Sequence, residues 1–193
     1  TSIRHVNNIQ YQFCCPVETP EGQKIGIVKS LSMISTITHQ DLSQKEIIND
    51  LLTDFKNIYH PFSVDPLEMK MIGKVYLNGN WTACTKDIYE LYNFLKEKQK
   101  ENVINNMTSI MLDYNKMELY VFFDGGRLIR PLINLVDNKT LLNKNIINEV
   151  IKYLNSNASS TGWKEITSKY PDIISYQDIE SSNYIMLAED LDV

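Results

Sequence analysis

The sequence predicts an α+β fold, in which a β-rich first body with hairpins and packed helices is followed by a smaller α+β body. Three observations support this prediction. Apolar residues recur at helical spacing in separate segments, β-prone runs lie between these segments, and an Asn-Gly pair joins two of the runs. The chain of 193 residues is long enough to bury a core, as one large domain or two small ones.

The composition is that of an ordinary globular protein, with 43% hydrophobic and 22% charged residues. The formal net charge is -5 at pH 7, and the sequence pI is about 5.2. A freestanding nucleic-acid-binding protein usually has a basic face, so this acidic balance argues against that class. We therefore expect any contact with DNA or RNA to be local.

The first 36 residues are rich in loop signals, and they include the β-prone run Ile25–Met33. Their backbone is punctuated by Pro16, Pro20, Gly22 and Gly26. From Asp41 the pattern changes to an amphipathic helix, which we expect to end near Lys56. Asp41 or Ser43 is available as its N-cap, and its apolar side carries Ile47, Ile48, Leu51, Leu52 and Phe55.

A hairpin is expected next, because Lys74–Leu77 and Trp81–Cys84 flank the pair Asn78-Gly79. This pair tolerates the positive φ that both central positions of a type I′ turn require. Thr85 is available to cap a second helix that ends in the charged run Lys96–Glu101. The apolar stripe of this helix consists of Ile88, Leu91, Tyr92 and Leu95.

The rest of the chain alternates between strand and helix signals. Two β-prone segments, Thr108–Asp113 and Met117–Phe123, precede a turn at residues 124–126. A third helix is expected over Leu141–Asn155, with a buried side formed by Ile146, Ile147, Val150, Ile151 and Leu154. The end of the chain predicts a short helix and two β-like pieces, at Trp163–Lys169, Ile173–Tyr176 and Tyr184–Ala188.

Several kinds of site are excluded by residue type and spacing. Cys14 and Cys15 are adjacent and cannot easily form a disulfide with each other, so a reducing compartment is the simpler expectation. No Cys-x-x-Cys pair is present and the three histidines have no ligand spacing, so we expect no metal site. Apolar runs such as Leu119–Phe123 are too short to span a bilayer, and no signal peptide is visible.

Two enzymatic motifs are also rejected. Residues 22–30 are superficially similar to a phosphate-binding P-loop, but Ile27 and Val28 stand where the pattern requires Gly directly before Lys-Ser. Cys15 with His5 suggests a thiol enzyme, but no third group that would orient the histidine is recognisable. No constellation supports an independent hydrolase.

The most informative stretch is residues 15–32, which read C-P-V-E-T-P-E-G-Q-K-I-G-I-V-K-S-L-S. It combines two carboxylates and two lysines with two glycines at which a neighbouring backbone can approach closely. Pro16 and Pro20 restrict the backbone. The charged side chains are therefore expected on a stiff loop, as the positioning of a ligand or partner requires.

This stretch closely resembles the C-P-x-E-T-P-E-G-x-x-x-G-L-V-K-x-L signature of the second-largest (β-type) subunits of multisubunit DNA-directed RNA polymerases. The usual aromatic-glycine pair before Cys-Pro is replaced by Gln12-Phe13-Cys14. The form of the loop is nearer to the archaeal and eukaryotic lineage, including RNA polymerase II and large DNA viruses, than to bacteria. Other segments resemble the family's fork approach, its V-x-x-N-G-x-W hairpin and its D-x-G-R-x-x-R-P-L strand, in that order: Arg4–Asn8, Val75–Trp81 and Asp124–Leu132.

The resemblance implies a segment that runs from the end of the fork through two external domains. The expected domains are residues 1–36 with the loop, residues 37–136 as an external 1-like domain, and residues 137–193 as an external 2-like domain. The implied reaction is template-directed nucleotidyl transfer with two Mg2+ ions held elsewhere in the assembled polymerase. This segment alone is therefore expected to bind no cofactor and to hold no catalytic residue.

The same resemblance implies the setting of the chain. The expected partners are the largest subunit and the other polymerase subunits, with DNA template, RNA and NTP in the assembled enzyme and no membrane. The expected location is intracellular: the nucleus for a cellular eukaryotic polymerase, and the host cytoplasm or the virion for a viral one.

The family loop also indicates site residues. Glu21 and Arg4 correspond to residues near the nucleotide-addition site, where a carboxylate orients basic side chains and a guanidinium suits phosphate or carboxylate. Candidates for contacts with a nucleic-acid backbone are Lys24 and Lys29. Loop stabilisation is expected from Glu18, Pro20, Gly22 and Gly26, and structural ion pairs or strand-end packing from Arg127 and Arg130. Without the resemblance, Glu21 reads as a solvated or capping carboxylate and Arg4 as a surface arginine.

A stand-alone protein-interaction module is the alternative from another functional class, in which the polymerase-like region only binds partner proteins. The chain starts at Thr1 without an initiator methionine, and this weighs against the module. We expect instead a piece of a larger protein. Tight binding to unrelated proteins, with no affinity for polymerase subunits, would support the module.

Overall fold

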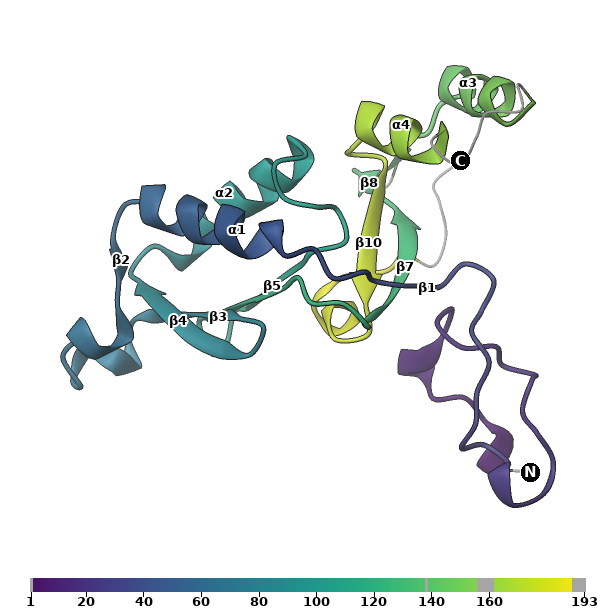
Figure 1. Cartoon of the computed structure of the whole chain (residues 1–193), viewed down its shortest axis with the longest axis horizontal. Coiled ribbons are helices and arrows are strands. Elements are labelled where there is room, and N and C mark those ends of the chain that lie inside the picture. The colour runs from purple at the N-terminus through teal and green to yellow at the C-terminus, as the bar shows by residue number, and fades with distance from the viewer. Residues whose placement is uncertain (1, 138, 156–161, 189–193) are drawn as a thin grey trace.

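The computed structural model describes residues 2–137, 139–155 and 162–188. The chain contains both helices and strands, and the strands form several sheets. The predicted α+β class is therefore confirmed. Residues 43–122 form what we call the core body, and residues 36–37, 128–133 and 174–178 form a small sheet beside it. Residues 2–35 extend from these two parts as an arm (Figure 1).

A five-stranded sheet with the order β2-β4-β3-β6-β5 forms the centre of the core body. β3 pairs with β6 in parallel, and the other neighbours pair antiparallel. Helices α1 (Ser43–Asp54) and α2 (Ile88–Lys100) lie over this sheet (Figure 1). The strands are β2 (Ile58–Tyr59), β3 (Gly73–Leu77), β4 (Asn80–Thr85), β5 (Ser109–Asp113) and β6 (Glu118–Phe122).

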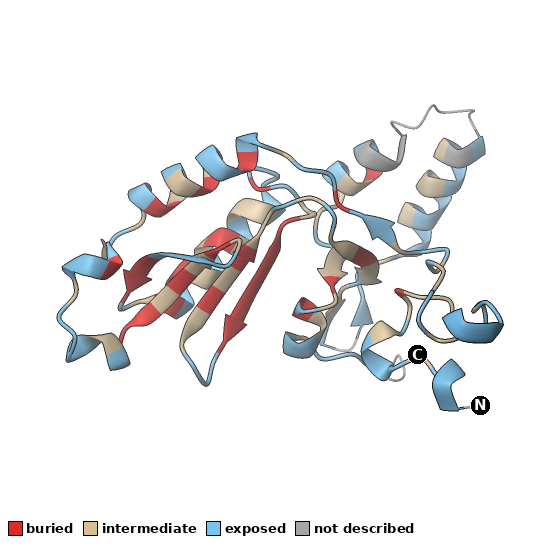
Figure 2. Ribbon diagram, turned by 60° about the horizontal axis from the view of Figure 1, so that its bottom comes forward, coloured by how far each residue is buried: buried red, intermediate tan, exposed pale blue. Residues whose placement is uncertain are grey.

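One cluster of buried apolar side chains joins the two helices to the sheet. Figure 2 shows many of the buried residues on the strands of the core body. Side chains alternate between buried and half-buried along β3 and β6, as expected for strands with one packed face. The cluster includes Ile48, Leu52, Val75, Leu77, Ile88, Leu91, Leu95, Ile110, Leu112, Leu119 and Val121.

The predicted hairpin is confirmed in its strands and its turn. Leu77 pairs with Asn80, and φ is 46° at Asn78 and 80° at Gly79. The predicted cap of the following helix is wrong, because Thr85 is the last residue of β4. Its hydroxyl oxygen accepts the backbone N–H of Asp87 at 3.1 Å, so it closes the turn before α2 instead of capping the helix.

The small sheet takes its strands from three distant parts of the chain. Its order is β1-β7-β10, and both pairs are antiparallel. β1 crosses the predicted domain limit at residue 36, and β7 and β10 lie on either side of the limit at residue 136. The sheet thus connects the three predicted ranges, whose limits stay a prediction. Its strands are β1 (Thr36–Ile37), β7 (Leu128–Ile133) and β10 (Ile174–Asp178).

The remaining elements follow β7. A short hairpin is formed by β8 (Leu135–Val136) and β9 (Lys139–Thr140). The helices are α3 (Lys144–Asn155) and α4 (Gly162–Lys169), as predicted. The expected burial of α3 is wrong for Ile147 and Ile151, which are 41% and 47% exposed because no described segment covers them. The side chain of Leu154 lies outside the described residues.

Two β-prone segments do not form strands. Ile25–Met33 consists of turns and bends with one bridge between Cys14 and Leu31, because the left-handed backbone of Gly22 and Gly26 turns the chain. Tyr184–Ala188 follows the 3-10 turn Ser181–Tyr184 and has no regular partner. Reciprocal hydrogen bonds between Asp178 and Ser181 start this turn, and β10 ends there.

Candidate functional site

The loop that the sequence indicates as the site is closed at its base by backbone pairing. The N–H of Cys15 donates to the carbonyl of Ser30 at 2.8 Å, and the N–H of Ser32 donates to the carbonyl of Phe13 at 3.0 Å. The hydroxyl of Ser32 also donates to the carbonyl of Gln12. Residues 16–29 therefore project from a closed base in the arm.

Thr19 holds the two sides of this loop together. Its hydroxyl oxygen accepts the N–H of Gly26 at 2.9 Å, and its hydroxyl lies 3.4 Å from the carbonyl oxygen of Val28. The sulfur of Cys15 accepts the N–H of Glu18 at 3.4 Å, so the thiol is part of the turn. Sequence reasoning assigned no role to Thr19, although a hydroxyl between two turn segments was the available signal.

The charged side chains of the loop are open to a partner. Glu21 stands at the N-cap position of the 3-10 turn Gly22–Lys24, but its carboxylate makes no capping hydrogen bond. Lys24 is exposed and Lys29 is half-buried, and neither forms an ion pair with a described carboxylate. Glu18 and Pro20 are exposed as well. The loop thus presents charge without neutralising it internally.

Arg4 lies on a turn that packs against this loop. A Cβ added at Gly26 would collide with the carbonyl oxygen of Ile3, in the 3-10 turn Ser2–Arg4. Gly26 also has φ of 72°, so both its backbone and its neighbour require glycine. Gly22 has φ of 81° but faces open space. Arg4 lines a cavity of about 400 Å³ together with His5, Asn7, Gln12 and Cys14.

Arg130 supports the base of the loop from strand β7. Its guanidinium carbon lies 4.9 Å from the ring centroid of Phe13, which is fully buried. Its Nη1 donates to the carbonyl of Tyr11 and to Oε1 of Gln12, both at 2.9 Å. Burial lowers the pKa of Arg130, because the charged form loses hydration. Its hydrogen-bond partners are neutral. Arg130 therefore packs against Phe13 and forms no ion pair with a described residue.

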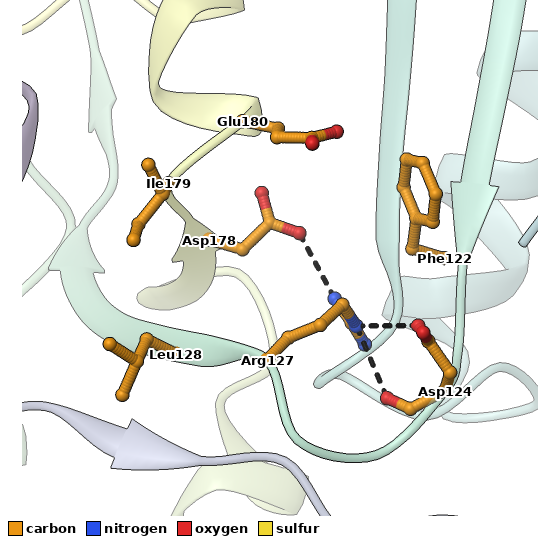
Figure 3. Close-up of a pocket in the computed structure, with 7 residues that line it drawn as sticks. All are labelled: Phe122, Asp124, Arg127, Leu128, Asp178, Ile179 and Glu180. Atoms are coloured by element: carbon orange, nitrogen blue, oxygen red, sulfur yellow. Dashed lines mark hydrogen bonds and ion pairs between the residues drawn. The ribbon is translucent and has the colours of Figure 1, made fainter. Parts of the chain in front are cut away.

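Arg127 makes the ion pairs that Arg130 lacks. Figure 3 shows its guanidinium between two carboxylates, with Nη1 3.0 Å from Oδ2 of Asp178 and Nε 3.0 Å from Oδ1 of Asp124. Nη1 also donates to Oγ of Ser109 at 2.7 Å, and Nη2 donates to the carbonyl of Met107 at 2.9 Å. These contacts connect the small sheet to the start of β5 in the core body.

Thr38 anchors the arm where it meets the rest of the molecule. Its N–H donates to the carbonyl of Arg127, and its carbonyl accepts the N–H of Gly126, both at 2.9 Å. Its hydroxyl donates to the carbonyl of Asp124 and accepts the N–H of Arg127, both at 3.0 Å. Sequence reasoning missed Thr38, because an uncharged residue in a loop carries no spacing signal.

Two negative findings complete the description of the site. In the described part of the chain, no group of three or more His, Cys, Asp or Glu residues is placed to hold a metal ion. No helix formed by the described residues is long and apolar enough to cross a membrane.

Comparisons with known proteins place these features in context. The model of "RNA polymerase Rpb2, domain 3" matches residues 1–37, and the model of "RNA polymerase Rpb2, domain 4" matches residues 75–136. DNA-directed RNA polymerase subunit 2 of Acanthamoeba polyphaga mimivirus is 35% identical over 97% of this chain. DNA-directed RNA polymerase II subunit RPB2 of Schizosaccharomyces pombe is 30% identical over 98% of it.

A more distant viral relative is similar over a shorter range. The probable DNA-directed RNA polymerase II subunit RPB2 homolog of Invertebrate iridescent virus 6 is 28% identical over 72% of the chain. This chain spans 15% of the length of the mimivirus protein, 16% of the yeast protein and 12% of the iridescent virus protein. The similarity thus covers nearly all of the chain and a small part of each relative.

Proposed function

The chain belongs to the family of second-largest subunits of DNA-directed RNA polymerases, and we propose that it serves transcription by helping to shape the nucleotide-addition site and by scaffolding its subunit. The observation that carries the proposal is a braced loop with unneutralised charges. The similarity over 97% of the chain gives no support to a stand-alone interaction module.

Glu21 and Arg4 are the proposed positioning residues near the incoming nucleotide. The contact between Gly26 and Ile3 supports this pairing of roles, because it packs the turn of Arg4 against the loop of Glu21. A carboxylate repels phosphate, so Glu21 acts by orienting basic side chains. Arg4, with a forked guanidinium, suits a phosphate or one of the family's carboxylates. Lys24 and Lys29 are proposed to contact a nucleic-acid backbone as point charges.

The supporting residues are proposed to act through backbone geometry. Gly26 allows the close approach of Ile3, and Gly22 allows the left-handed turn after Glu21. Glu18 and Pro20 shape the loop from its exposed side. Arg127 and Arg130 are proposed as structural residues, because Arg127 joins the small sheet to the core body and Arg130 supports the base of the loop.

We further propose that the chemistry depends on the assembled polymerase. Mg2+ ions held by other parts of the enzyme would supply charge stabilisation for nucleotidyl transfer. The proposed partners are the largest subunit, the other subunits, DNA, RNA and NTP. The proposed location is the nucleus for a cellular polymerase, and the host cytoplasm or the virion for a viral one. The proposed domains are residues 1–36, 37–136 and 137–193, and the two matched family ranges support the first two.

The test replaces the positioning residues in the assembled polymerase. Glu21→Gln and Arg4→Ala should each lower the elongation rate several-fold, and should raise KM for NTP or misincorporation without a loss of thermal stability. Glu46→Gln is the control, because Glu46 is an exposed carboxylate on α1, outside the loop, and its kinetics should stay those of the unchanged enzyme. Wild-type kinetics for both Glu21→Gln and Arg4→Ala would refute the assigned roles.

A further inference from the structure

A groove of about 760 Å³ lies along one face of the small sheet. Its walls come from the arm, from strands β7 and β10, and from the segment that follows the turn Ser181–Tyr184. Register places Arg130 opposite Gln177 and Leu132 opposite Ser175, so these four side chains share the face on which the groove lies. The groove is separate from the loop that carries Glu21.

Arg130 is the one charged residue among the described residues that line the groove. Arg130 is buried, with 3% of the residue exposed. Nη1 is used by Tyr11 and Gln12, whereas buried Nε has no hydrogen-bond partner in the described part of the chain. No hydrogen bond is present from Nη2 to a described residue either. Nε is therefore a buried donor without an acceptor, and Nη2 is left free to donate to a ligand.

A buried cation with an unsatisfied donor calls for an anion. Transfer of a charge out of water is costly unless the charge is paired and hydrogen-bonded. The nearby carboxylates of Asp124 and Asp178 already contact Arg127. Gln12 offers Arg130 only a neutral amide oxygen. A carboxylate matches the geometry of the Nε and Nη2 donors, because its two oxygens accept two parallel hydrogen bonds.

The walls of the groove indicate what carries the carboxylate. Apart from Arg130 they combine apolar side chains with neutral polar ones, and the apolar Met186 and Leu187 are exposed. A nucleic acid would require several basic groups along its backbone, and the lining provides one. A small free anion would leave the apolar side chains in water. An extended peptide with acidic and apolar side chains satisfies both features.

We propose that this groove binds an extended acidic segment of a partner polypeptide, with one of its carboxylates on Arg130 and its apolar side chains against Leu132, Met186 and Leu187. The arm gains rigidity from this contact, because the same guanidinium lies against Phe13 at the base of the loop.

The test measures binding of an eight-residue peptide in which aspartate alternates with leucine, and of its counterpart with asparagine in place of aspartate. Both are titrated into the 193-residue chain by calorimetry. The chain carries Glu189→Gln, Asp190→Asn and Asp192→Asn in both arms, so that these carboxylates do not compete. We expect the acidic peptide to bind at least about tenfold more tightly than the amide peptide.

Exposed methionines provide the matched variants, because replacement of buried Arg130 would also disturb the arm. Met186, in the groove, is 98% exposed, and Met71, on the core body, is 83% exposed. Met186→Asp should weaken the acidic peptide about tenfold by charge repulsion, and Met71→Asp should leave its affinity unchanged. Equal affinities for the two peptides, or equal effects of the two variants, would overturn the proposal. Tighter binding of a single-stranded oligonucleotide than of the acidic peptide would also overturn it.

Discussion

The core body and the arm are stabilised in different ways. In the core body, α1, α2 and five strands share one buried apolar cluster. In the arm, Phe13 is the one buried side chain among residues 2–35, and apolar side chains such as Val17, Ile27 and Met33 are exposed. The residues proposed to act near the nucleotide thus lie on the part that has almost no core of its own.

The difference shows that the loop depends on supports from distant parts of the chain. Arg130 supports the base of the loop, Gly26 meets the turn of Ile3, and Thr38 holds the end of the arm. Each support is a few polar or backbone contacts rather than a packed layer. The core body should therefore respond to the loss of apolar volume, and the arm to the loss of single contacts.

The largest effect is expected from Arg127→Met, which would test the joint between the core body and the small sheet. The change leaves Asp178, a buried carboxylate, without its cation. Breaking one side of a buried pair costs about 3–5 kcal/mol. Chemical denaturation measures this loss, and adding Asp178→Asn should restore part of it. A loss below about 1 kcal/mol would mean that the joint does not rest on this ion pair.

Leu91→Ala and Val17→Ala compare the two regions directly. Leu91 is fully buried in the cluster of the core body, and Val17 is 84% exposed in the arm. Leu91→Ala should lower the free energy of unfolding by about 2–5 kcal/mol because it leaves a cavity. Val17→Ala should change it by about 0.5 kcal/mol or less. Similar losses for the two variants would contradict the contrast between the regions.

Gly26→Ala should affect the arm and spare the core body. The new methyl group would collide with the Ile3 carbonyl, and the backbone is left-handed, so a local cost of about 1–3 kcal/mol is expected. Gly22→Ala is the control, because it shares the left-handed backbone but meets no neighbour. Hydrogen exchange should show faster exchange of arm amides in Gly26→Ala than in Gly22→Ala. Equal exchange would argue against the Ile3 contact.

The smallest effect concerns the pH dependence of the core body. Burial lowers the pKa of Lys96 to about 8, with a smaller contribution from the like charge of Lys100. The unfolded chain then binds more protons than the folded chain above about pH 8, so stability should rise as the pH increases from about 7.5 to 9. Lys96→Met should remove this rise and add about 1 kcal/mol near pH 7.

The control for this measurement is Lys45→Met, since Lys45 is exposed on α1. Its pH profile should match that of the unchanged chain. The range ends at pH 9 because burial raises the pKa of Cys84, and the thiol opposes the rise at higher pH. A flat profile in the unchanged chain would show that Lys96 is hydrated and that its side of α2 is less packed than described.

Local patterns allowed much of the core body to be predicted. The apolar stripes of α1 and α2, the strands β5 and β6, and the turn at Asn78-Gly79 follow from rules that span a few residues. The wrong predictions lie where contacts with distant residues decide the local conformation. Thr85 belongs to strand β4, and Ile25–Met33 turns at Gly26, which the Ile3 carbonyl approaches closely.

The candidate site was predicted by its motif and not by its surroundings. The resemblance to the family signature implied roles for Glu21 and Arg4, and only the fold showed that the turn of Arg4 packs against the loop of Glu21. Thr19, Thr38 and Asp178 carry no charge pattern or spacing that marks them in a sequence. Their importance is visible only through the partners they contact.

The helices, the tight hairpin and the family loop could be read from the amino-acid sequence, because backbone propensity and apolar periodicity act between neighbours along the chain. Tertiary structure alone decided that β1, β7 and β10 form one sheet and that Arg130 lies under Phe13. Two of these contacts, Thr36 with Ile129 and Tyr11 with Arg130, join residues more than 90 positions apart in the sequence. Closing such long loops depends on the free energy of the whole packed molecule, which no local pattern records.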